Sequence, residues 1–194
     1  YGRDYYNEEI LGLKFKVNAF SFFQTNIEAV ERLYSEALAL IPDLDSKVVY
    51  DLYCGTGTIS QLMASKAKKV YGIEIVQDSV DAAIDNAKMN NIDNCHFISG
   101  DVKAKLDEVT EKPDMIVVDP PRMGMHDKVV EMLSSYGIEQ ILYISCNPNT
   151  MAMNLEKFSE LGYEPVVMKA YDNFPKTKHA EAVTLLVKSG TDAN

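Results

Sequence analysis

The sequence predicts an α/β protein with a mostly parallel, seven-stranded sheet, and three features of the chain support this prediction. Five short runs rich in Val, Ile and Tyr alternate with helical patterns, as expected for consecutive βαβ units. The runs are apolar along most of their length, which is typical of parallel strands covered by helices on both faces. Two further strand-like runs follow each other closely near the C-terminal end, as in an antiparallel hairpin.

The alternating elements can be placed along the chain from composition and periodicity. Parallel strands are expected at 47–53, 69–75, 95–100, 114–120 and 140–146, and the hairpin strands at 164–174 and 181–189. Helices are expected at 58–67, 77–90, 102–109, 126–136 and 149–161, with a further amphipathic helix before the first strand at 26–41. Five αβ units closed by such a hairpin form the pattern of the S-adenosylmethionine (SAM) dependent methyltransferase fold, which is Rossmann-like.

The domain organisation is expected to be simple. The 194 residues suffice for one substantial domain, and they contain no internal repeat, low-complexity tract or convincing linker. We therefore expect a single catalytic domain over residues 1–194, with residues 1–45 as an N-terminal extension to the core fold. Because the chain begins with Tyr1 and not with Met, we expect it to be the C-terminal piece of a longer protein.

Composition and charge exclude several functional classes. The chain has 19 Lys and Arg against 29 Asp and Glu, and this net charge of −10 argues against a nucleic-acid footprint over the whole surface. A nucleic-acid substrate would need a local basic patch or another domain. No apolar run approaches the ~20 residues that span a bilayer, and no secretory signal is present, so a cytoplasmic location without a membrane partner is expected.

The three cysteines, Cys54, Cys95 and Cys146, are too few and too scattered for a disulfide framework or a CxxC metal site. We therefore expect neither a metal ion nor an iron–sulfur cluster in this chain. Each cysteine is left as a free thiol, as is usual in a reducing compartment.

The run "DLYCGTGTIS" ends the first predicted strand and opens a helix, where ligands bind in doubly wound sheets. Gly55 and Gly57 allow the backbone to approach a ligand closely. Glu74 ends the second strand, where a carboxylate can accept hydrogen bonds from both ribose hydroxyls of an adenosine group. NAD is the rival to SAM, but Ser60 occupies the third-glycine position of the dinucleotide fingerprint, and the closing hairpin also favours SAM. Asp101, after the third strand, is either a contact to the adenine amino group or a helix N-cap.

The run "DPPR" at 119–122 ends the fourth strand, where two prolines stiffen the chain and hold Asp119 and Arg122 beside the ligand crevice. Asp-Pro-Pro is related to the Asn-Pro-Pro signature of amino methyltransferases. An enzyme acting on adenine N6 or guanine N2 is therefore the alternative function. A purely structural double proline at a strand end is the third interpretation.

The run "SCNP" at 145–148 favours carbon chemistry, because an amino methyltransferase has no use for a thiol. C5 of uracil is a poor nucleophile, and addition of the Cys146 thiolate to C6 makes C5 able to attack a methyl group. Such a route also needs a base that removes the C5 proton, for which Glu181 in "FPKTKHAE" is the candidate. His179 could relay the proton, although a loop histidine is more often only solvated.

Six motifs occur in the order "SFFQTN", "DLYCGTGT", "GIE", "DPPR", "YISCNP" and "DNFPKTKHAE". Together they resemble the RNA uracil-C5 methyltransferase family, which forms 5-methyluridine in transfer and ribosomal RNA, over essentially the whole chain. The resemblance implies that Cys146 is the nucleophile and Glu181 the general base. It further implies that the residues around SAM are Gln24, Tyr53, Glu74 and Asp119, with Gln24 and Asp119 also near the uracil edge. The Gly-Thr-Gly-Thr loop is closer to the ribosomal-RNA members of the family.

The resemblance implies an RNA partner, and the acidic composition implies that this chain alone binds RNA weakly. Family members usually carry an N-terminal RNA-binding barrel, which would supply much of the affinity. The aromatic residues at 19–23 either line a pocket for the extruded base or belong to the core. A SAM-binding module without catalysis is the non-enzymatic alternative, against which the presence of both Cys146 and Glu181 counts.

Overall fold

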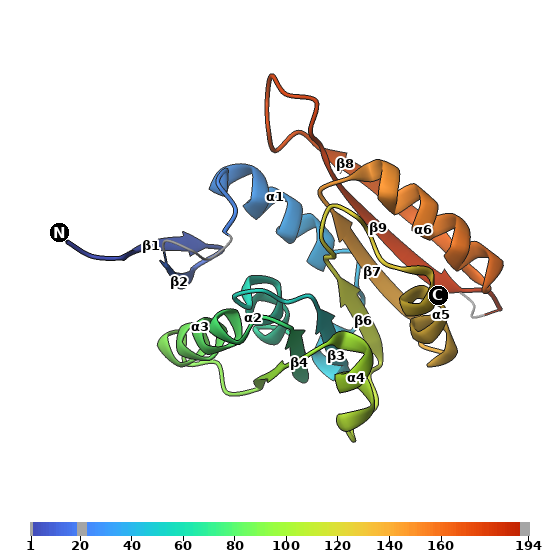
Figure 1. Ribbon diagram of the computed structural model, residues 1–194, viewed down its shortest axis with the longest axis horizontal. Coiled ribbons are helices and arrows are strands. Elements are labelled where there is room, and N and C mark those ends of the chain that lie inside the picture. Colours follow the sequence, from blue (N-terminus) through green and yellow to red (C-terminus); the bar gives the residue numbers. More distant parts are fainter. Residues whose placement is uncertain (1, 19–22, 191–194) are drawn as a thin grey trace.

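The computed structural model describes residues 2–18 and 23–190 and contains the predicted sheet (Figure 1). Its seven strands follow the order β5-β4-β3-β6-β7-β9-β8. In chain order they are β3 (Val48–Leu52), β4 (Lys69–Glu74), β5 (Cys95–Ser99), β6 (Met115–Val118), β7 (Gln140–Ser145), β8 (Tyr163–Tyr171) and β9 (Glu181–Lys188). The first five are parallel, whereas β9 runs antiparallel to both β7 and β8. The predicted fold class and its closing hairpin are confirmed.

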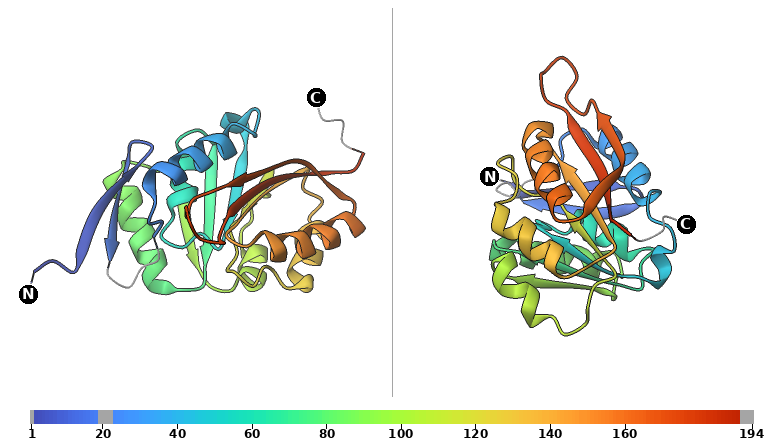
Figure 2. Two further views of the ribbon diagram at one scale, coloured as in Figure 1. Left: turned by 90° about the horizontal axis from the view of Figure 1, so that it is seen from above. Right: turned by 90° about the vertical axis from the view of Figure 1, so that its right-hand side faces the viewer.

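The helices cover both faces of the sheet (Figure 2). They are α1 (Ile27–Leu38), α2 (Thr58–Ala64), α3 (Gln77–Met89), α4 (Val102–Lys105), α5 (Asp127–Ser135) and α6 (Pro148–Glu160). Apolar side chains of α1 and α2 share one core cluster, and those of α4, α5 and α6 share another. The predicted helix at 102–109 is shorter than expected, because a 3₁₀ turn at Leu106–Glu108 replaces its second half.

A second, two-stranded sheet of β1 (Tyr5–Ile10) and β2 (Leu13–Asn18) was not predicted. Its two-residue turn has positive φ at Leu11 (50°) and Gly12 (82°), and leucine is a rare residue at such a position, so the sequence carries no strong turn signal. The hairpin packs against the C-terminal end of α3, where backbone amides of Lys14 and Lys16 donate to the side chains of Asn90 and Asn86, each over 2.8 Å.

No helix in the part of the chain that the structure describes is long and apolar enough to cross a membrane.

The predicted helix at 26–41 is present as α1, and the aromatic segment before it lies outside the described residues except for Phe23. Phe23 is buried and contacts Phe15, with 5.8 Å between the ring centroids. Phe23 therefore belongs to the core, and it also lines the cavity described next, whereas its use in a pocket for an extruded base stays a prediction.

Candidate active site

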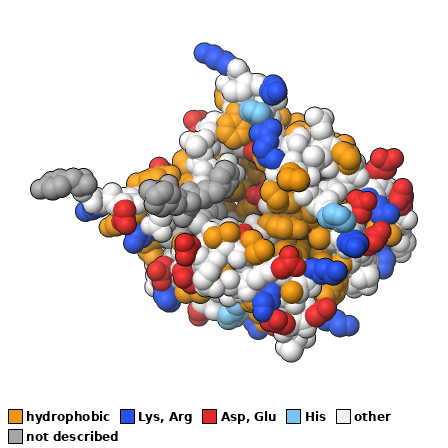
Figure 3. Space-filling model, viewed as in Figure 1, with side chains coloured by type: hydrophobic (Ala, Val, Ile, Leu, Met, Phe, Trp, Pro, Cys, Tyr) orange, Lys and Arg blue, Asp and Glu red, His pale blue; other side chains and the backbone are white. Residues whose placement is uncertain are grey.

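A cavity of about 350 Å³ lies at the carboxyl ends of the parallel strands, where the sheet topology places ligands. The space-filling view shows it as a hollow bordered by hydrophobic side chains (Figure 3). It is lined by Phe23, Gln24, Tyr34, Tyr53, Cys54, Gly55, Thr56, Thr58, Ile59, Ser79, Asp119, Pro120, Pro121, Arg122, Cys146 and Glu181. Of the eight predicted site residues, six line this one cavity and two, Glu74 and Asp101, do not.

The loop after β3 forms one wall of the cavity through an unusual backbone path. Tyr53, Gly55 and Gly57 all have positive φ, at 66°, 53° and 77°. A Cβ at Gly55 would meet no protein atom within 4 Å, so this residue faces open space. Glu74 lies behind the loop and holds it, because one carboxylate oxygen accepts from the Gly55 amide over 3.1 Å and the other from the Val76 amide over 2.9 Å.

Asp101 acts as a helix N-cap in the structure. Its side chain accepts hydrogen bonds from the backbone amides of Lys103 and Ala104, at 3.0 and 3.3 Å, and so begins α4. The capping interpretation is confirmed, whereas a contact between Asp101 and an adenine amino group stays a prediction.

Crowding makes Gly57 the least replaceable glycine of the loop. A Cβ there would lie 2.7 Å from the Phe97 ring and 2.9 Å from the Ala83 Cβ. We expect Gly57→Ala to lower the free energy of unfolding by about 2–4 kcal/mol in urea denaturation, combining overpacking with a disfavoured φ. Gly162→Ala is the matched control, because Gly162 also has positive φ (83°) but open space around its Cβ position. Equal losses in both variants would contradict the crowding at Gly57.

Beneath the loop, Asp51 of β3 is fully buried. One carboxylate oxygen accepts from the Ser60 hydroxyl, and the other has no partner in the described part of the chain. Burial raises the pKa of Asp51 to about 7; the hydrogen bonds from Ser60 lower it in part, and the Glu74 charge adds the smallest contribution, which raises it. Ser60 occupies the third-glycine position of the dinucleotide fingerprint, and its hydroxyl donates a hydrogen bond to the buried Asp51 carboxyl group.

The raised pKa of Asp51 predicts a pH-dependent stability. The folded state holds a proton that the unfolded state releases, so stability falls as pH rises from about 4 to about 7. Asp51→Asn removes the ionisable group, and we expect its melting temperature to exceed that of the wild type at pH 8. The stabilisation is on the order of a few kcal/mol and shrinks at pH 5. The same difference in melting temperature between Asp51→Asn and the wild type at pH 5 and at pH 8 would contradict the raised pKa of Asp51.

The two motifs after β6 and β7 are fastened to each other. The Asn147 side chain donates to the Arg122 carbonyl over 2.9 Å and also accepts from the Asn149 amide, which caps α6. Thr150 donates from its hydroxyl to the same Arg122 carbonyl over 3.2 Å. These bonds hold the "DPPR" segment against Asn147, the residue that follows Cys146. The sequence did not predict this role of Asn147.

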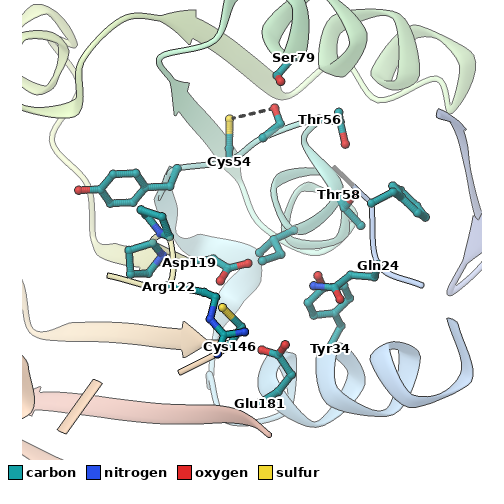
Figure 4. Close-up of a pocket in the computed structure, with 16 residues that line it drawn as sticks. Gln24, Tyr34, Cys54, Thr56, Thr58, Ser79, Asp119, Arg122, Cys146 and Glu181 are labelled. Carbon is teal, nitrogen blue, oxygen red and sulfur yellow. Dashed lines mark hydrogen bonds between the residues drawn. The ribbon is translucent and has the colours of Figure 1, made fainter. Parts of the chain in front are cut away.

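Cys146, Glu181, Asp119 and Arg122 converge on one end of the cavity (Figure 4). Burial raises the pKa of the Cys146 thiol, and the charges of Glu181 and Asp119 raise it further, while Arg122 lowers it. Burial also raises the pKa of Glu181, against the influence of Arg122. The pKa of Asp119 lies well above its ordinary value because of burial and the charges of Glu181 and Asp51. The arrangement places one thiol, two carboxyl groups whose pKa values are raised, and one guanidinium around the same space.

Tyr34 is a cavity residue that the sequence did not single out. It is buried on α1 and faces Gln24 in the cavity, where burial raises its pKa well above the ordinary value (Figure 4). Its position within the apolar stripe of α1 is indistinguishable in sequence from an ordinary core position. The sequence also did not single out three small hydroxyl residues that line the cavity, Thr56, Thr58 and Ser79. Such residues are common near helix starts, so their presence there does not indicate a binding site.

His179 lies at the rim and does not line the cavity. Its Nδ1 is 3.2 Å from an Arg122 nitrogen. Because a guanidinium can only donate, Nδ1 accepts this hydrogen bond. A role of His179 as a proton relay stays a prediction.

Comparison with solved structures identifies the class of fold. Precorrin-6y C5,15-methyltransferase from Geobacter metallireducens, 16% identical, superposes with a TM-score of 0.70 over 88% of this chain and 94% of its own. Pyrococcus abyssi tRNA (uracil-54, C5)-methyltransferase, crystallised with S-adenosyl-L-homocysteine, is 29% identical and has a TM-score of 0.82 over 96% of this chain and 45% of its own. The chain has the SAM-dependent methyltransferase fold.

Sequence comparison identifies the family. A family model described as tRNA (uracil-5-)-methyltransferase matches residues 5–112 and 103–189, so the chain belongs to this family. An uncharacterized RNA methyltransferase of Caldanaerobacter subterraneus is 51% identical over 97% of this chain, and one of Clostridium acetobutylicum is 49% identical over 96%. This chain spans 42% and 41% of these two relatives, about two fifths of their length.

Proposed function

We propose that residues 1–194 form the catalytic domain of an enzyme that transfers a methyl group from SAM to C5 of a uridine in RNA. The observation that carries the proposal is that one cavity is lined by Cys146, Glu181 and Asp119 as well as by the loop after β3. The loop fits SAM, because Gly55 leaves open space and Glu74 ends β4 directly behind it. When bound, SAM supplies the electrophilic methyl group and leaves as S-adenosylhomocysteine.

The chain's own residues account for the remaining steps. The Cys146 thiol releases its proton to solvent water, and the thiolate adds to C6, which moves the electron pair of the C5–C6 double bond to C5. C5 then forms the bond to the methyl group. Glu181 takes the proton from C5, the C5–C6 double bond forms again, and the thiolate is expelled. Burial makes the Glu181 carboxylate a stronger base than an exposed one, as proton abstraction near neutral pH requires.

Asp119 and Gln24 are placed to bind the edge of the uracil ring. Burial and the neighbouring charges raise the pKa of Asp119 and so favour its protonated form, which can donate a hydrogen bond to a uracil carbonyl. Addition of the thiolate to C6 increases the negative charge on that carbonyl oxygen, and a preorganised donor stabilises it. The Gln24 amide has both a donor and an acceptor for the remaining polar atoms of the edge.

A second candidate, methylation of an amino group on adenine or guanine, is favoured by one observation. Asp119, Pro120 and Pro121 line the cavity as they would in an enzyme that acts on planar nitrogen. In that reaction Cys146 has no role, so the two candidates predict different positions of the methyl group. A SAM-binding module without catalysis predicts no methylated nucleoside at all.

The test is nucleoside mass analysis of RNA treated with the full-length protein and SAM. Unmodified ribosomal RNA and unmodified transfer RNA are supplied separately, because the Gly-Thr-Gly-Thr loop favours the first, whereas the named Pyrococcus neighbour acts on the second. We expect 5-methyluridine in one of them. Methyladenosine or methylguanosine in its place would support the second candidate, and bound SAM without product would support the module.

A further inference from the structure

The loop between β8 and β9 projects above the cavity and carries basic side chains at the top of the molecule (Figures 1 and 3). Lys176 and Lys178 are exposed there. Across residues 2–18 and 23–190, neither ammonium group has an ion-pair or hydrogen-bond partner, whereas Lys69 and Lys157 are paired with glutamates. In a chain of net charge −10 the loop is therefore a local excess of positive charge beside the cavity.

A tight turn presents Lys176 at the tip of this loop. The Thr177 amide donates to the Phe174 carbonyl over 3.1 Å, Pro175 is the second residue, and Lys176 is the third, with φ of 68°. A turn with positive φ at its third residue favours glycine or asparagine there. Lysine is thus held in a backbone conformation that glycine would adopt with less strain, which points to a use for its side chain.

The loop is also anchored to the cavity rim. The His179 amide donates to the Thr177 hydroxyl over 3.1 Å, and the His179 ring meets the Phe174 ring edge to face. On the other side, His179 is bonded to Arg122, which lines the cavity. Two residues later the chain reaches Glu181 within the cavity. The two lysines therefore have a fixed relation to the site where the base would react.

We propose that Lys176 and Lys178 bind phosphate groups of the single-stranded RNA segment that flanks the reacting nucleotide. This inference rests on the proposed function. A uridine that reaches Cys146 must leave its stack, so its own backbone passes over the cavity mouth. Phosphate contacts of this kind position RNA without reading its sequence. The lysines contribute to affinity and placement, whereas the choice of base belongs to the cavity.

The test compares two double variants of the full-length protein that remove equal charge. Lys176→Gln with Lys178→Gln changes the loop, and Lys66→Gln with Lys68→Gln is the control, with the same spacing on an exposed segment before β4. The probe is a fluorescently labelled oligocytidine with one central uridine, titrated over a range of salt concentrations. If each loop lysine neutralises one phosphate, the slope of log K against log salt falls by about 1.4 in the loop variant.

We expect weaker RNA binding and the reduced salt slope only in the loop variant, with SAM affinity equal in all proteins. Equal RNA affinity and equal slope in the loop and control variants would overturn the inference. Lys176→Gly separates charge from folding, since it relieves the turn, and it is expected to weaken RNA binding without lowering the melting temperature. If the wild type binds RNA but forms no 5-methyluridine, the proposed function fails while the comparison of lysines still tests the loop.

Discussion

Cys146→Ala is expected to reduce methyl transfer by about 10⁴-fold or more, because no other group can activate C5 by adding to C6. SAM affinity is expected to stay within a few-fold of the wild type, since the loop after β3 and Glu74 are untouched. Methylation is measured by transfer of labelled methyl groups to RNA, and SAM binding by calorimetry.

Cys54→Ala is the matched control for this variant. Cys54 lines the same cavity, but it lies on the loop after β3, and burial raises the pKa of its thiol well above the ordinary value (Figure 4). We expect it to retain most of the activity. Undiminished turnover by Cys146→Ala would rule out the covalent route and favour an amino methyltransferase.

Glu181→Gln is expected to stop the reaction after methyl transfer, whereas Cys146→Ala stops it before the thiolate adds to C6. Its amide cannot take the C5 proton, so the methylated adduct cannot expel the thiolate, and turnover falls by about 10²–10⁴-fold. Because addition and methyl transfer precede this step, we expect RNA to accumulate in covalent linkage to the protein, visible by denaturing electrophoresis with labelled RNA.

Glu164→Gln provides the comparison, because Glu164 is an exposed glutamate of β8 outside the cavity. It is expected to behave as the wild type. A Glu181→Gln protein that turns over normally, or one that is slow without any covalent RNA, would assign proton removal to another group.

Much of the fold follows from local sequence signals. Alternation of apolar strands with helical patterns defines the sheet, and glycines, prolines and the closing hairpin define where its ligand crevice lies. The β1–β2 hairpin escaped prediction because its turn uses Leu11, a residue type that rarely adopts a positive φ; its backbone amide donates to the Glu31 side chain over 2.8 Å, a contact between residues 20 positions apart. The hairpin also bonds to Asn86 in α3 and to Asn90 just after it, and the hairpin sequence alone does not predict these tertiary contacts.

The candidate site was predictable where its residues lie at strand ends. Asp119 and Cys146 follow the carboxyl ends of the parallel strands β6 and β7, which meet at one edge of the sheet. Glu181 begins the antiparallel strand β9, so its N-terminal end lies at that same edge. Tyr34 was not predictable, because a tyrosine on an apolar helix stripe is usually a core residue. The bond between Asn147 and Arg122 joins residues 25 positions apart, and only the folded chain shows it.

RNA that carries 5-fluorouridine can trap the covalent bond that we propose between Cys146 and the base. Fluorine cannot leave C5 as a proton does, so the enzyme should stall after methyl transfer with RNA attached. The measurement is the intact mass of the full-length protein incubated with SAM and an RNA substrate that carries 5-fluorouridine at the methylated position. We predict a mass increase equal to the RNA plus one methyl group, absent without SAM and absent in Cys146→Ala. A wild-type enzyme that methylates the normal RNA but forms no adduct with the fluorinated RNA would contradict the claim.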